Sequence, residues 1–376
     1  MLTITKVDTN NKTQVRKFVQ FPYKHYQDCP FWVPPLFIDA NLFLDRKKHP
    51  FFEHSDADFF IAELDGQVVG RIGVLENRAF NLYHNTKEAQ FYFFESIDDQ
   101  DVANALFEPA FAWARARGLT RIVGPKGMGP LDGYGVLVEG YQHRQMMTMM
   151  NYNYDYYPRL VENLGFEKEV DFVSCYVPAE NFNIPERVER IAKRVLDRGK
   201  LQVKRFKSKR ELVEWSWRIG QAYNAAFVNN WEYFPFTERE IKFVVDNIVT
   251  IADHRLIKII VRDEQPVGFL FAFPDLSAAL QRARGKLFPF GLLDLLLEMR
   301  RTKTVSGNGM GILPEFQGHG GNALLYYEMA NSFMEFEFQH VEMTQVAETA
   351  TQMRADLKNL KGVEYKNHRV YHKALD

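Results

Sequence analysis

Cysteine is nearly absent from this chain of 376 residues, which contains only Cys29 and Cys175. Two cysteines cannot build a disulfide framework or a cysteine-based zinc site. The longest apolar stretch, from Phe288 to Met299, carries Asp294 and is well under the roughly 20 residues that span a bilayer. The N-terminal residues also lack the apolar core of a signal peptide. These absences favour a cytoplasmic protein without a membrane partner.

An excess of charge of either sign is absent as well. The chain has 47 Lys and Arg residues against 48 Asp and Glu residues, which leaves a formal net charge of −1. Because broad nucleic-acid binding depends on a basic surface field, we expect no nucleic-acid partner. Hydrophobic residues make up 46% and charged residues 25%, which is typical of a globular protein. At roughly 150 residues per domain, the length predicts two domains.

Motifs for two common chemistries are missing. His49 and His54 are spaced too far apart for the zinc-binding helix motifs, and Pro50 disrupts helical display between them. No Gly-x-Ser-x-Gly sequence is present, so the nucleophile elbow of the α/β-hydrolases is lacking. We therefore expect no metal and no hydrolase-type serine.

The chain contains one short pattern twice. Residues 62–72 and 261–270 each predict a strand, a two-residue turn and a second strand. Three identical residues recur at a constant displacement of 198 positions: Asp65 and Asp263, Gln67 and Gln265, Gly70 and Gly268. The repetition indicates two similar units of a little under 200 residues each.

Each unit is predicted to run strand, helices, a meander of three strands, helix, strand, helix and strand. This order predicts an α/β (α+β) fold in which each unit has a mixed, mostly antiparallel sheet with helices on both faces. The predicted parts are an N-terminal domain (1–180), a helical linker (181–200) and a C-terminal domain (201–376).

Residues 277–303 have no counterpart in the first half and are predicted to be a helical insertion. The insertion carries an apolar run from Leu292 to Leu297 that contains one charged residue. This run is consistent with a helix packed in the core, and also with a lid or a contact between two copies in a homodimer.

A glycine-rich segment in the second half carries the most specific signal. A strand that ends at Pro314 is followed by a loop with Gly318, Gly320 and Gly321, which opens directly into an apolar helix. Such a loop exposes backbone N–H groups, and the helix N-terminus adds partial positive charge. The combination favours a phosphate or pyrophosphate site, although a purely structural turn has the same composition. The segment matches neither a Walker loop nor the Rossmann glycine pattern.

The segment resembles the acyl-CoA loop of the GNAT acetyltransferase superfamily, whose pattern is Gln/Arg-x-x-Gly-x-Gly/Ala. The whole chain is similar to bacterial tandem GNAT-like proteins of unassigned substrate, with further matches at 50–54, 69–72, 124–125, 156–157, 223–224 and 274–276. The resemblance implies acetyl-CoA or another acyl-CoA as co-substrate. It places CoA binding at Gly311, Ile312, Leu313, Gln317, Gly318, His319, Gly320, Gly321, Asn322 and Ala323.

The corresponding segment of the first half, residues 94–102, has no glycine and four acidic residues: Glu95, Asp98, Asp99 and Asp101. Carboxylates at a helix start suit the helix dipole but repel a pyrophosphate. We therefore expect the N-terminal domain to be a degenerate GNAT-like domain that does not bind CoA. It is expected to shape a substrate cleft or to stabilise the second domain.

The resemblance implies direct attack of an amine on the thioester, with backbone near Gly311–Leu313 holding the carbonyl. Glu348, after the next strand, is the candidate general base, although a solvated carboxylate or a helix-cap role fits the same position. The following helix lacks a tyrosine to protonate the thiolate, so Tyr365 or Tyr371 is the substitute. Candidates for the acceptor pocket are Tyr156, Tyr157, Tyr223, Asn224, Trp231 and Asp275, although core packing is the simpler interpretation of each residue alone.

These features predict an acyl-CoA-dependent N-acyltransferase, with acetyl transfer to the amine of a small molecule or peptide as the leading form. Two alternatives stay open at this point. One is a non-catalytic CoA-binding or interaction protein, and the other is a tandem-GNAT aminoacyl transferase that uses charged tRNA. The neutral charge balance disfavours the tRNA-dependent alternative.

Overall fold

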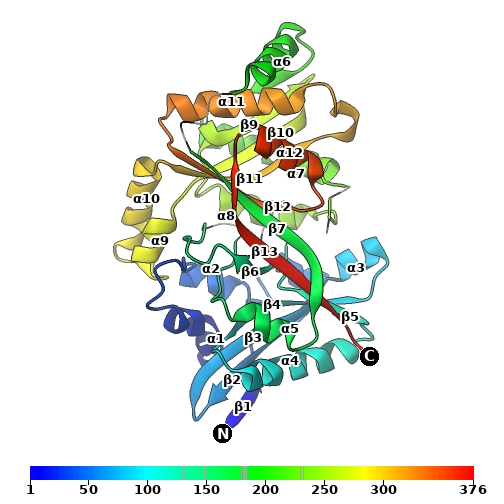
Figure 1. Ribbon diagram of the computed structural model, residues 1–376, viewed down its shortest axis with the longest axis vertical. Helices are drawn as coiled ribbons and strands as arrows, with labels where there is room; N and C mark the ends of the chain where they lie inside the picture. Colours follow the sequence, from blue (N-terminus) through cyan, green and yellow to red (C-terminus); the bar gives the residue numbers. More distant parts are fainter. Residues whose placement is uncertain (130–131, 148–149, 179, 181–183, 229, 232) are drawn as a thin grey trace. The chain divides into compact units, whose positions relative to one another are not determined.

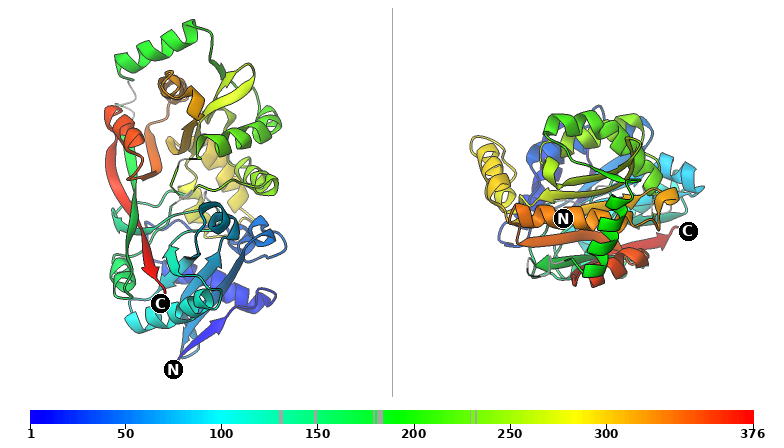
Figure 2. Two further views of the ribbon diagram at one scale, coloured as in Figure 1. Left: turned by 90° about the vertical axis from the view of Figure 1, so that its right-hand side faces the viewer. Right: turned by 90° about the horizontal axis from the view of Figure 1, so that it is seen from above.

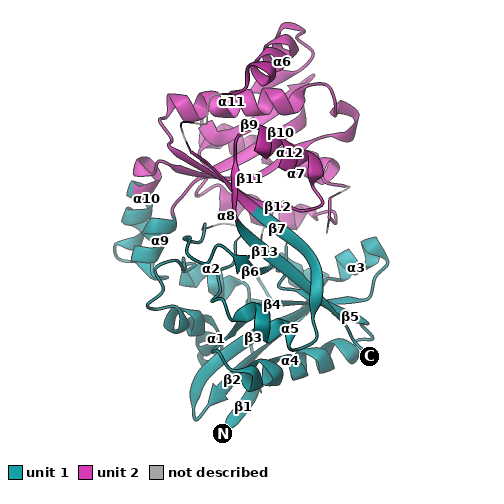
Figure 3. Ribbon diagram, in the orientation of Figure 1, with its two compact units in different colours: residues 1–173, 277–297, 366–376 teal, residues 174–276, 298–365 magenta. Residues whose placement is uncertain are grey.

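The computed structural model describes the whole chain except residues 130–131, 148–149, 179, 181–183, 229 and 232 (Figure 1). The chain forms two compact units that are each discontinuous in sequence (Figure 3). Unit 1 comprises residues 1–173, 277–297 and 366–376, and unit 2 comprises residues 174–276 and 298–365. The units therefore take in different residues from the domains expected at 1–180 and 201–376, because much of the insertion and the last residues pack with unit 1. The division into two repeats joined by a 181–200 linker stays a prediction.

Unit 1 is built on a mixed sheet. Its strands are β1 (Leu2–Lys6), β2 (Asp56–Leu64), β3 (Gln67–Glu76), β4 (Glu88–Ser96), β5 (Arg121–Gly124), β6 (Val136–Glu139), the first residues of β7 (Glu167–Pro178) and most of β13 (Val363–Ala374). The order is β1-β2-β3-β4-β5-β13, with β6 also paired to β13. Only β4 and β5 in this series run parallel. Its helices are α1 (Lys12–His25), α2 (Phe37–Leu42), α3 (Arg78–His84), α4 (Gln100–Arg115), α5 (Tyr157–Glu162), α9 (Ser277–Ala283) and most of α10 (Gly291–Arg301).

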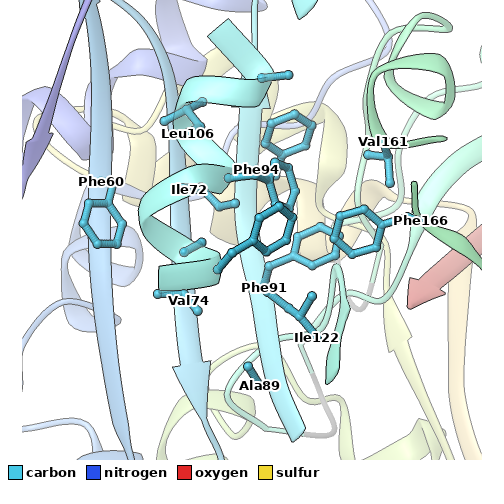
Figure 4. Packing of buried hydrophobic residues seen from close by; sticks show 14 of the residues in the cluster. Phe60, Ile72, Val74, Ala89, Phe91, Phe94, Leu106, Ile122, Val161 and Phe166 are labelled. Atoms are coloured by element: carbon cyan, nitrogen blue, oxygen red, sulfur yellow. The ribbon is translucent and has the colours of Figure 1, made fainter. Parts of the chain in front are cut away.

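Helices cover both faces of this sheet because its strands bury both faces. Phe60 of β2 faces the cluster that α4 completes with Leu106 and Phe107 (Figure 4). Its neighbour Phe59 faces the opposite side, where Phe18 of α1 packs at 5.4 Å between ring centroids. Successive strand side chains point to opposite faces, so the two neighbours serve separate layers. The predicted mixed sheet with helices on both sides is confirmed.

Unit 2 repeats this architecture. Its strands are β8 (Gln202–Lys204), β9 (Ile257–Arg262), β10 (Gln265–Pro274), β11 (Thr304–Ile312), β12 (His340–Ala347) and the remaining residues of β7 and β13. The order β12-β11-β10-β9-β8 is antiparallel except for the parallel pair β11–β12. Its α-helices are α6 (Glu186–Asp197), α7 (Lys209–Ala226), α8 (Glu238–Ile248), α11 (Gly321–Glu335) and α12 (Thr351–Asn359). α6 lies against α11 (Figure 2).

The predicted hairpins form in both units and have the same type of turn and the same bulge position. The turn residues Asp65 and Gly66 have φ of 50° and 80°, and Asp263 and Glu264 have φ of 50° and 61°. Two consecutive positive φ values define the tight turn that matches strand twist. A bulge follows at Val69 in one hairpin and at Val267 in the other, again 198 positions apart.

The carbonyls of these bulged valines accept equivalent hydrogen bonds. Ile97 N–H donates to Val69 O, and Leu313 N–H donates to Val267 O, each at 3.0 Å. Ile97 follows β4, and Leu313 follows β11. The same strand end is therefore fastened in the same way in both units, and this correspondence aligns β4 of unit 1 with β11 of unit 2.

Strand β13 completes the sheet of unit 1 from the far end of the sequence. Tyr371 to Ala374 pair antiparallel with β5, and Asn367 to Arg369 pair with β6. Asp171 of β7 accepts hydrogen bonds from Arg369 at 2.8 and 3.0 Å. Local sequence patterns could not predict this pairing, because its two sides are more than 220 residues apart.

His368 in β13 gives unit 1 a pH-dependent stability. Its Nε2 lies 3.0 Å from Asn151 O, the ring is 1% exposed, and burial lowers its pKa from 6.5 to about 4. Between pH 6.5 and 4 the unfolded chain binds a proton that the folded chain does not. The free energy of unfolding therefore decreases as the pH is lowered through this range. We expect His368 to account for at most about 3 kcal/mol of that loss.

Urea unfolding of wild type and His368→Gln from pH 7.5 to 4 measures this contribution. The variant should show a shallower decline in the free energy of unfolding over this range, whatever its stability at pH 7.5. Parallel declines for the two proteins would show that His368 is not kept neutral by the fold.

Candidate functional site

An open strand edge in unit 2 lies beside the glycine-rich loop. β11 and β12 pair from Thr304 with His340 to Gly307 with Met343, and no pair between them is described beyond that point. β11 nevertheless continues along β10 as far as Ile312. Within the part of the chain that the structure describes, the last residues of β11 therefore have a strand partner on one side only, which leaves backbone N–H groups on the other side available to a ligand.

The loop after β11 presents unpaired backbone donors. Gly318 and Gly320 have left-handed φ of 77° and 86°, and residues 317–319 are exposed. Helix α11 begins at Gly321 with no side-chain cap at Gly320. The first N–H groups of a helix have no partner within it. Among the described residues, no group accepts a hydrogen bond from the N–H groups of Gly320 to Ala323, so these donors and the helix dipole suit an anion.

Helix α6 packs beside this loop. A Cβ on Gly320 would lie 2.8 Å from Val195 Cγ2 and 3.0 Å from Ile191 Cγ2, so only glycine fits there. The same helix carries Arg194, whose side chain is exposed. The predicted linker helix is thus an integral part of the loop's surroundings and brings a cation to its neighbourhood.

Of the backbone N–H groups of Gly311, Ile312 and Leu313 at the end of β11, one is oriented to donate to the carbonyl of a bound thioester. Leu313 donates its N–H to Val267 O. Since backbone groups alternate sides along an antiparallel pair, Gly311 also faces β10, and Ile312 faces the open edge. Gln317 Nε2 donates to Ile312 O at 3.2 Å, which agrees with that orientation. Of the three predicted carbonyl-holding residues, Ile312 has the geometry for the task.

Aromatic side chains of α7 form a wall near the same strand end. Tyr223 stacks on Phe269 with 5.8 Å between ring centroids, and Phe269 pairs with Gly311. A Cβ on Gly311 would lie 2.9 Å from Ala226 Cβ, so α7 approaches the strand closely. Burial raises the pKa of Tyr223, which keeps its phenol neutral.

The other predicted pocket residues of unit 2 are placed differently. Asn224 exchanges hydrogen bonds of 3.2 Å with the backbone of Phe236, which fixes the loop before α8. Trp231 is half-buried in that loop. Asp275 is buried, and its N–H donates to Thr304 O at the start of β11, the end opposite the glycine loop. The described hydrogen bonds of Asn224 and Asp275 are thus with backbone groups, and their place in an acceptor pocket stays a prediction.

The two predicted catalytic residues lie toward opposite ends of β12. Glu348 is half-buried in the turn after the last residue of β12. The ring of Tyr365 contacts Tyr176 at 6.3 Å, and Tyr176 in turn contacts His340, the first residue of β12. Strand β12 has eight residues, and at about 3.3 Å per residue it places His340 roughly 25 Å from the turn that contains Glu348. Tyr365 is therefore poorly placed to act with Glu348 in one step.

The equivalent helix start in unit 1 is closed to anions. Asp99 caps α4 by accepting hydrogen bonds from the N–H groups of Asp101 and Val102. The expectation that acidic residues occupy this helix start is confirmed for Asp99 and Asp101. It is wrong for Glu95, which lies within β4 with only 13% of its side chain exposed.

Glu95 is the centre of a hydrogen-bonded cluster that the sequence did not reveal. Its carboxylate accepts from Tyr26 at 2.5 Å and from Tyr157 at 2.8 Å. The Tyr157 hydroxyl also lies 3.1 Å from His25 Nε2, and Arg71 faces the carboxylate at 3.9 Å. Residues from α1, β3, β4 and α5 thus meet at one carboxylate, so no short motif could signal the group.

Burial controls the protonation of this cluster. It raises the pKa of Glu95 against the opposing effect of Arg71. Burial and the nearby Arg71 cation lower the pKa of His25 to about 4. Tyr156 donates to Ser96 O at 2.7 Å beside the cluster. Both predicted tyrosines of unit 1, Tyr156 and Tyr157, are therefore brought together around β4.

Comparison with known proteins agrees with this architecture. Residues 16–124 match the sequence model of the Acetyltransferase (GNAT) family. The fold matches a tandem GNAT protein from the clavulanic acid biosynthesis pathway with a TM-score of 0.57 at 12% identity, over 100% of this chain and 99% of that one. A GCN5-related N-acetyltransferase from Sphaerobacter thermophilus matches with a TM-score of 0.52 at 12% identity, over 100% and 96%. Residues 16–124 thus carry the sequence of the GNAT family, and the whole chain has the fold of a tandem GNAT protein.

Two curated relatives match nearly the whole length of this chain. Protein YghO of Escherichia coli is 28% identical over 371 residues, which are 97% of this chain and 94% of YghO. A protein named bacterial ceramide synthase, from Caulobacter vibrioides, is 28% identical over 383 residues, 99% of this chain and 98% of the relative. Both relatives therefore match this chain across the sequences of both units.

The family match lies within unit 1, whereas the open glycine loop lies in unit 2. The family model thus matches the unit whose helix start is capped by Asp99. Helix α11, which has no side-chain cap, lies in unit 2. Among the described residues, no helix is both long and apolar enough to cross a bilayer, and no three His, Cys, Asp or Glu side chains gather to hold a metal ion.

Proposed function

We propose that this protein is an acyl-CoA-dependent N-acyltransferase that binds acyl-CoA at the loop and helix start of residues 317–323. The observation that carries the proposal is the contrast between the two helix starts. In unit 1 Asp99 accepts hydrogen bonds from first-turn donors of α4, whereas in unit 2 those of α11 have no acceptor among the described residues and follow the exposed Gly318. A diphosphate gains from unpaired N–H groups and from the positive helix end.

The acyl thioester would lie along the open edge of β11. Ile312 N–H faces that edge and suits a carbonyl whose oxygen gains negative charge during attack. The aromatic wall at Tyr223 and Phe269 borders the same strand end and supplies apolar surface to an acyl chain. These features support acyl transfer in general and do not favour an acetyl group over a longer one.

We propose a long-chain amino alcohol as the acceptor class. The Caulobacter relative is named a ceramide synthase, and a ceramide is a long-chain amino alcohol acylated on nitrogen. Its near-complete overlap with this chain supports a similar acceptor here. An amine acceptor also agrees with the direct attack typical of the superfamily.

The reaction requires one bond exchange and one proton transfer. The neutral amine attacks the thioester carbonyl carbon, the C–N bond forms, and the C–S bond breaks to release the CoA thiolate. The proton lost by the amine nitrogen restores the thiol. We propose Glu348 as the group that accepts this proton, directly or through water, because it follows β12 at the open side of the sheet.

Release of CoA tests the function. The protein is incubated with acetyl-CoA or palmitoyl-CoA and with a short amine or a long-chain 2-amino alcohol, and the amide is identified by mass spectrometry. We expect amide and free CoA to appear in equal amounts, and most rapidly with the long-chain amine. Binding of acyl-CoA without amide formation from any pair would instead support the non-catalytic CoA-binding alternative.

Glu348→Gln is expected to lower kcat about a hundredfold or more, because general-base catalysis contributes roughly 10²–10⁴-fold. The KM for acyl-CoA should stay nearly unchanged, since the loop is intact. Glu364→Gln is the matched control, because Glu364 is an exposed carboxylate of the same unit paired with Arg354 at 2.8 Å. Equal kcat values for the two variants would remove Glu348 from the proposed chemistry.

A further inference from the structure

The α9–α10 hairpin is fixed to unit 1 through residues 277–297. Arg282 in α9 pairs with both carboxylate oxygens of Asp294 in α10, at 2.8 and 2.9 Å. Gln281 donates to the carbonyls of Pro30 and Trp32, and Gly285 O accepts from Phe37 N–H at 2.8 Å. The hairpin therefore holds a defined surface toward its outer side and is not a loose loop.

That surface is unusually apolar. Phe288 and Phe290, in the connection between the helices, are 71% and 76% exposed. On α10, Leu292 and Leu296 are one helical turn apart, and with Leu293 they form a stripe that is 42–57% exposed. The interpretation of this run as a packed core helix is therefore wrong for these three leucines. We call these five residues the apolar stripe.

Positive charges stand at both ends of the apolar stripe. Arg284 and Lys286 are exposed immediately before Phe288, and Arg300 and Arg301 are exposed at the C-terminal end of α10. Two acidic residues lie on the same helix: Asp294 is paired with Arg282, and Glu298 is half-buried. The arrangement combines an apolar helix face with flanking cations, which is the pattern of helices that lie in a membrane interface.

The positive charges also indicate whether a second copy of the chain or an anionic lipid surface binds here. A second copy of the chain would bring the same cations toward one another and lose binding energy through like-charge repulsion. An anionic lipid surface gains from each cation near the headgroups and accepts the apolar side chains below them. Exposed apolar patches of this kind mark interaction surfaces.

We propose that the α9–α10 hairpin docks this protein on an anionic lipid surface, with the apolar stripe inserted and Arg284, Lys286, Arg300 and Arg301 at the headgroups. Surface binding needs no spanning segment, so the expectation of no membrane partner does not follow from the short apolar runs. The proposal does not depend on acyl transfer, because it concerns binding alone. A lipid-like acceptor would nonetheless be encountered at such a surface.

Vesicle flotation tests the proposal with the full chain. Vesicles of phosphatidylcholine with one third phosphatidylglycerol are compared with pure phosphatidylcholine vesicles at low and at high salt. We expect wild type to float with the anionic vesicles and to be released at least partly by salt, since charge screening weakens the headgroup contacts. The triple variant Phe288→Ser, Phe290→Ser, Leu293→Ser should lose at least about tenfold in partition.

The double variant Leu82→Ser, Tyr83→Ser is the matched control, because these α3 residues are also exposed apolar side chains of unit 1, at 85% and 45%. It should float like wild type. Failure of wild type to bind anionic vesicles, or equal binding by the triple variant, would overturn the proposal. Conversion of a dimer to a monomer by the triple variant, without vesicle binding by wild type, would assign the stripe to a contact between copies instead.

Discussion

Gly318→Glu is expected to weaken acyl-CoA binding by about ten- to a hundredfold. Gly318 has a left-handed φ of 77°, and a Cβ placed on it meets no atom within 4 Å, so the new side chain extends into solvent beside the loop. A carboxylate roughly 6 Å from a phosphate charge costs up to about 3 kcal/mol at an effective dielectric constant of 20. Calorimetric titration with a non-hydrolysable acyl-CoA analogue measures the change in Kd.

Two comparisons separate charge from backbone strain in this experiment. Gly66→Glu introduces the same side chain at a glycine with φ of 80° and equally open surroundings, in the turn before β3. It should cost similar stability and leave acyl-CoA binding intact. Gly318→Gln has the strain without the charge and should retain most of the affinity. Equal affinity for Gly318→Glu and Gly66→Glu would place the CoA diphosphate elsewhere.

Arg71→Ala is expected to lower the free energy of unfolding by about 3–5 kcal/mol, the cost of removing one partner of a buried ion pair. Arg71 is 8% exposed, donates to Phe18 O at 3.1 Å and lies over the rings of Phe18 and Phe93. Its loss leaves Glu95 without a facing cation and opens space between aromatic rings. Chemical denaturation at pH 7.5 measures the loss.

Arg78→Ala provides the comparison for an exposed pair. Arg78 contacts Glu76 at 3.4 Å with 57% of its side chain exposed, so its loss should cost less than about 1 kcal/mol. The double variant Arg71→Met, Glu95→Leu should recover part of the stability, because apolar replacement of a buried pair is often tolerated. A loss for Arg71→Ala as small as that for Arg78→Ala would show that the cluster does not need the cation.

Local chemistry explains what could be predicted from the sequence. The Asp65–Gly66 turn, the cap at Asp99 and the loop from Gln317 to Asn322 each depend on residues within a few positions of one another. The structure contains the two hairpins and the helix start at Gly321 as expected. For the site, the loop and the strand before it were therefore accessible to prediction.

Long-range contacts explain what could not be predicted. The Glu95 cluster draws on Tyr26, Arg71 and Tyr157, which are up to 131 positions apart. Helix α1 itself contains Pro22, which obscures its helical pattern. Tyr365 is a candidate acid only because the helix after Glu348 lacks a tyrosine, and the fold places it beside Tyr176. The catalytic pair was thus the least predictable part of the site.

The pairing of β13 with β5 has a consequence for biosynthesis. The ribosome makes residues 121–139 long before residues 366–374, so the sheet of unit 1 emerges with one edge unoccupied. At about 5–20 residues per second, roughly 10–50 seconds of translation separate the two segments. During that interval β5 exposes unpaired backbone groups, and nascent unit 1 is a natural client for chaperones that shield strand edges.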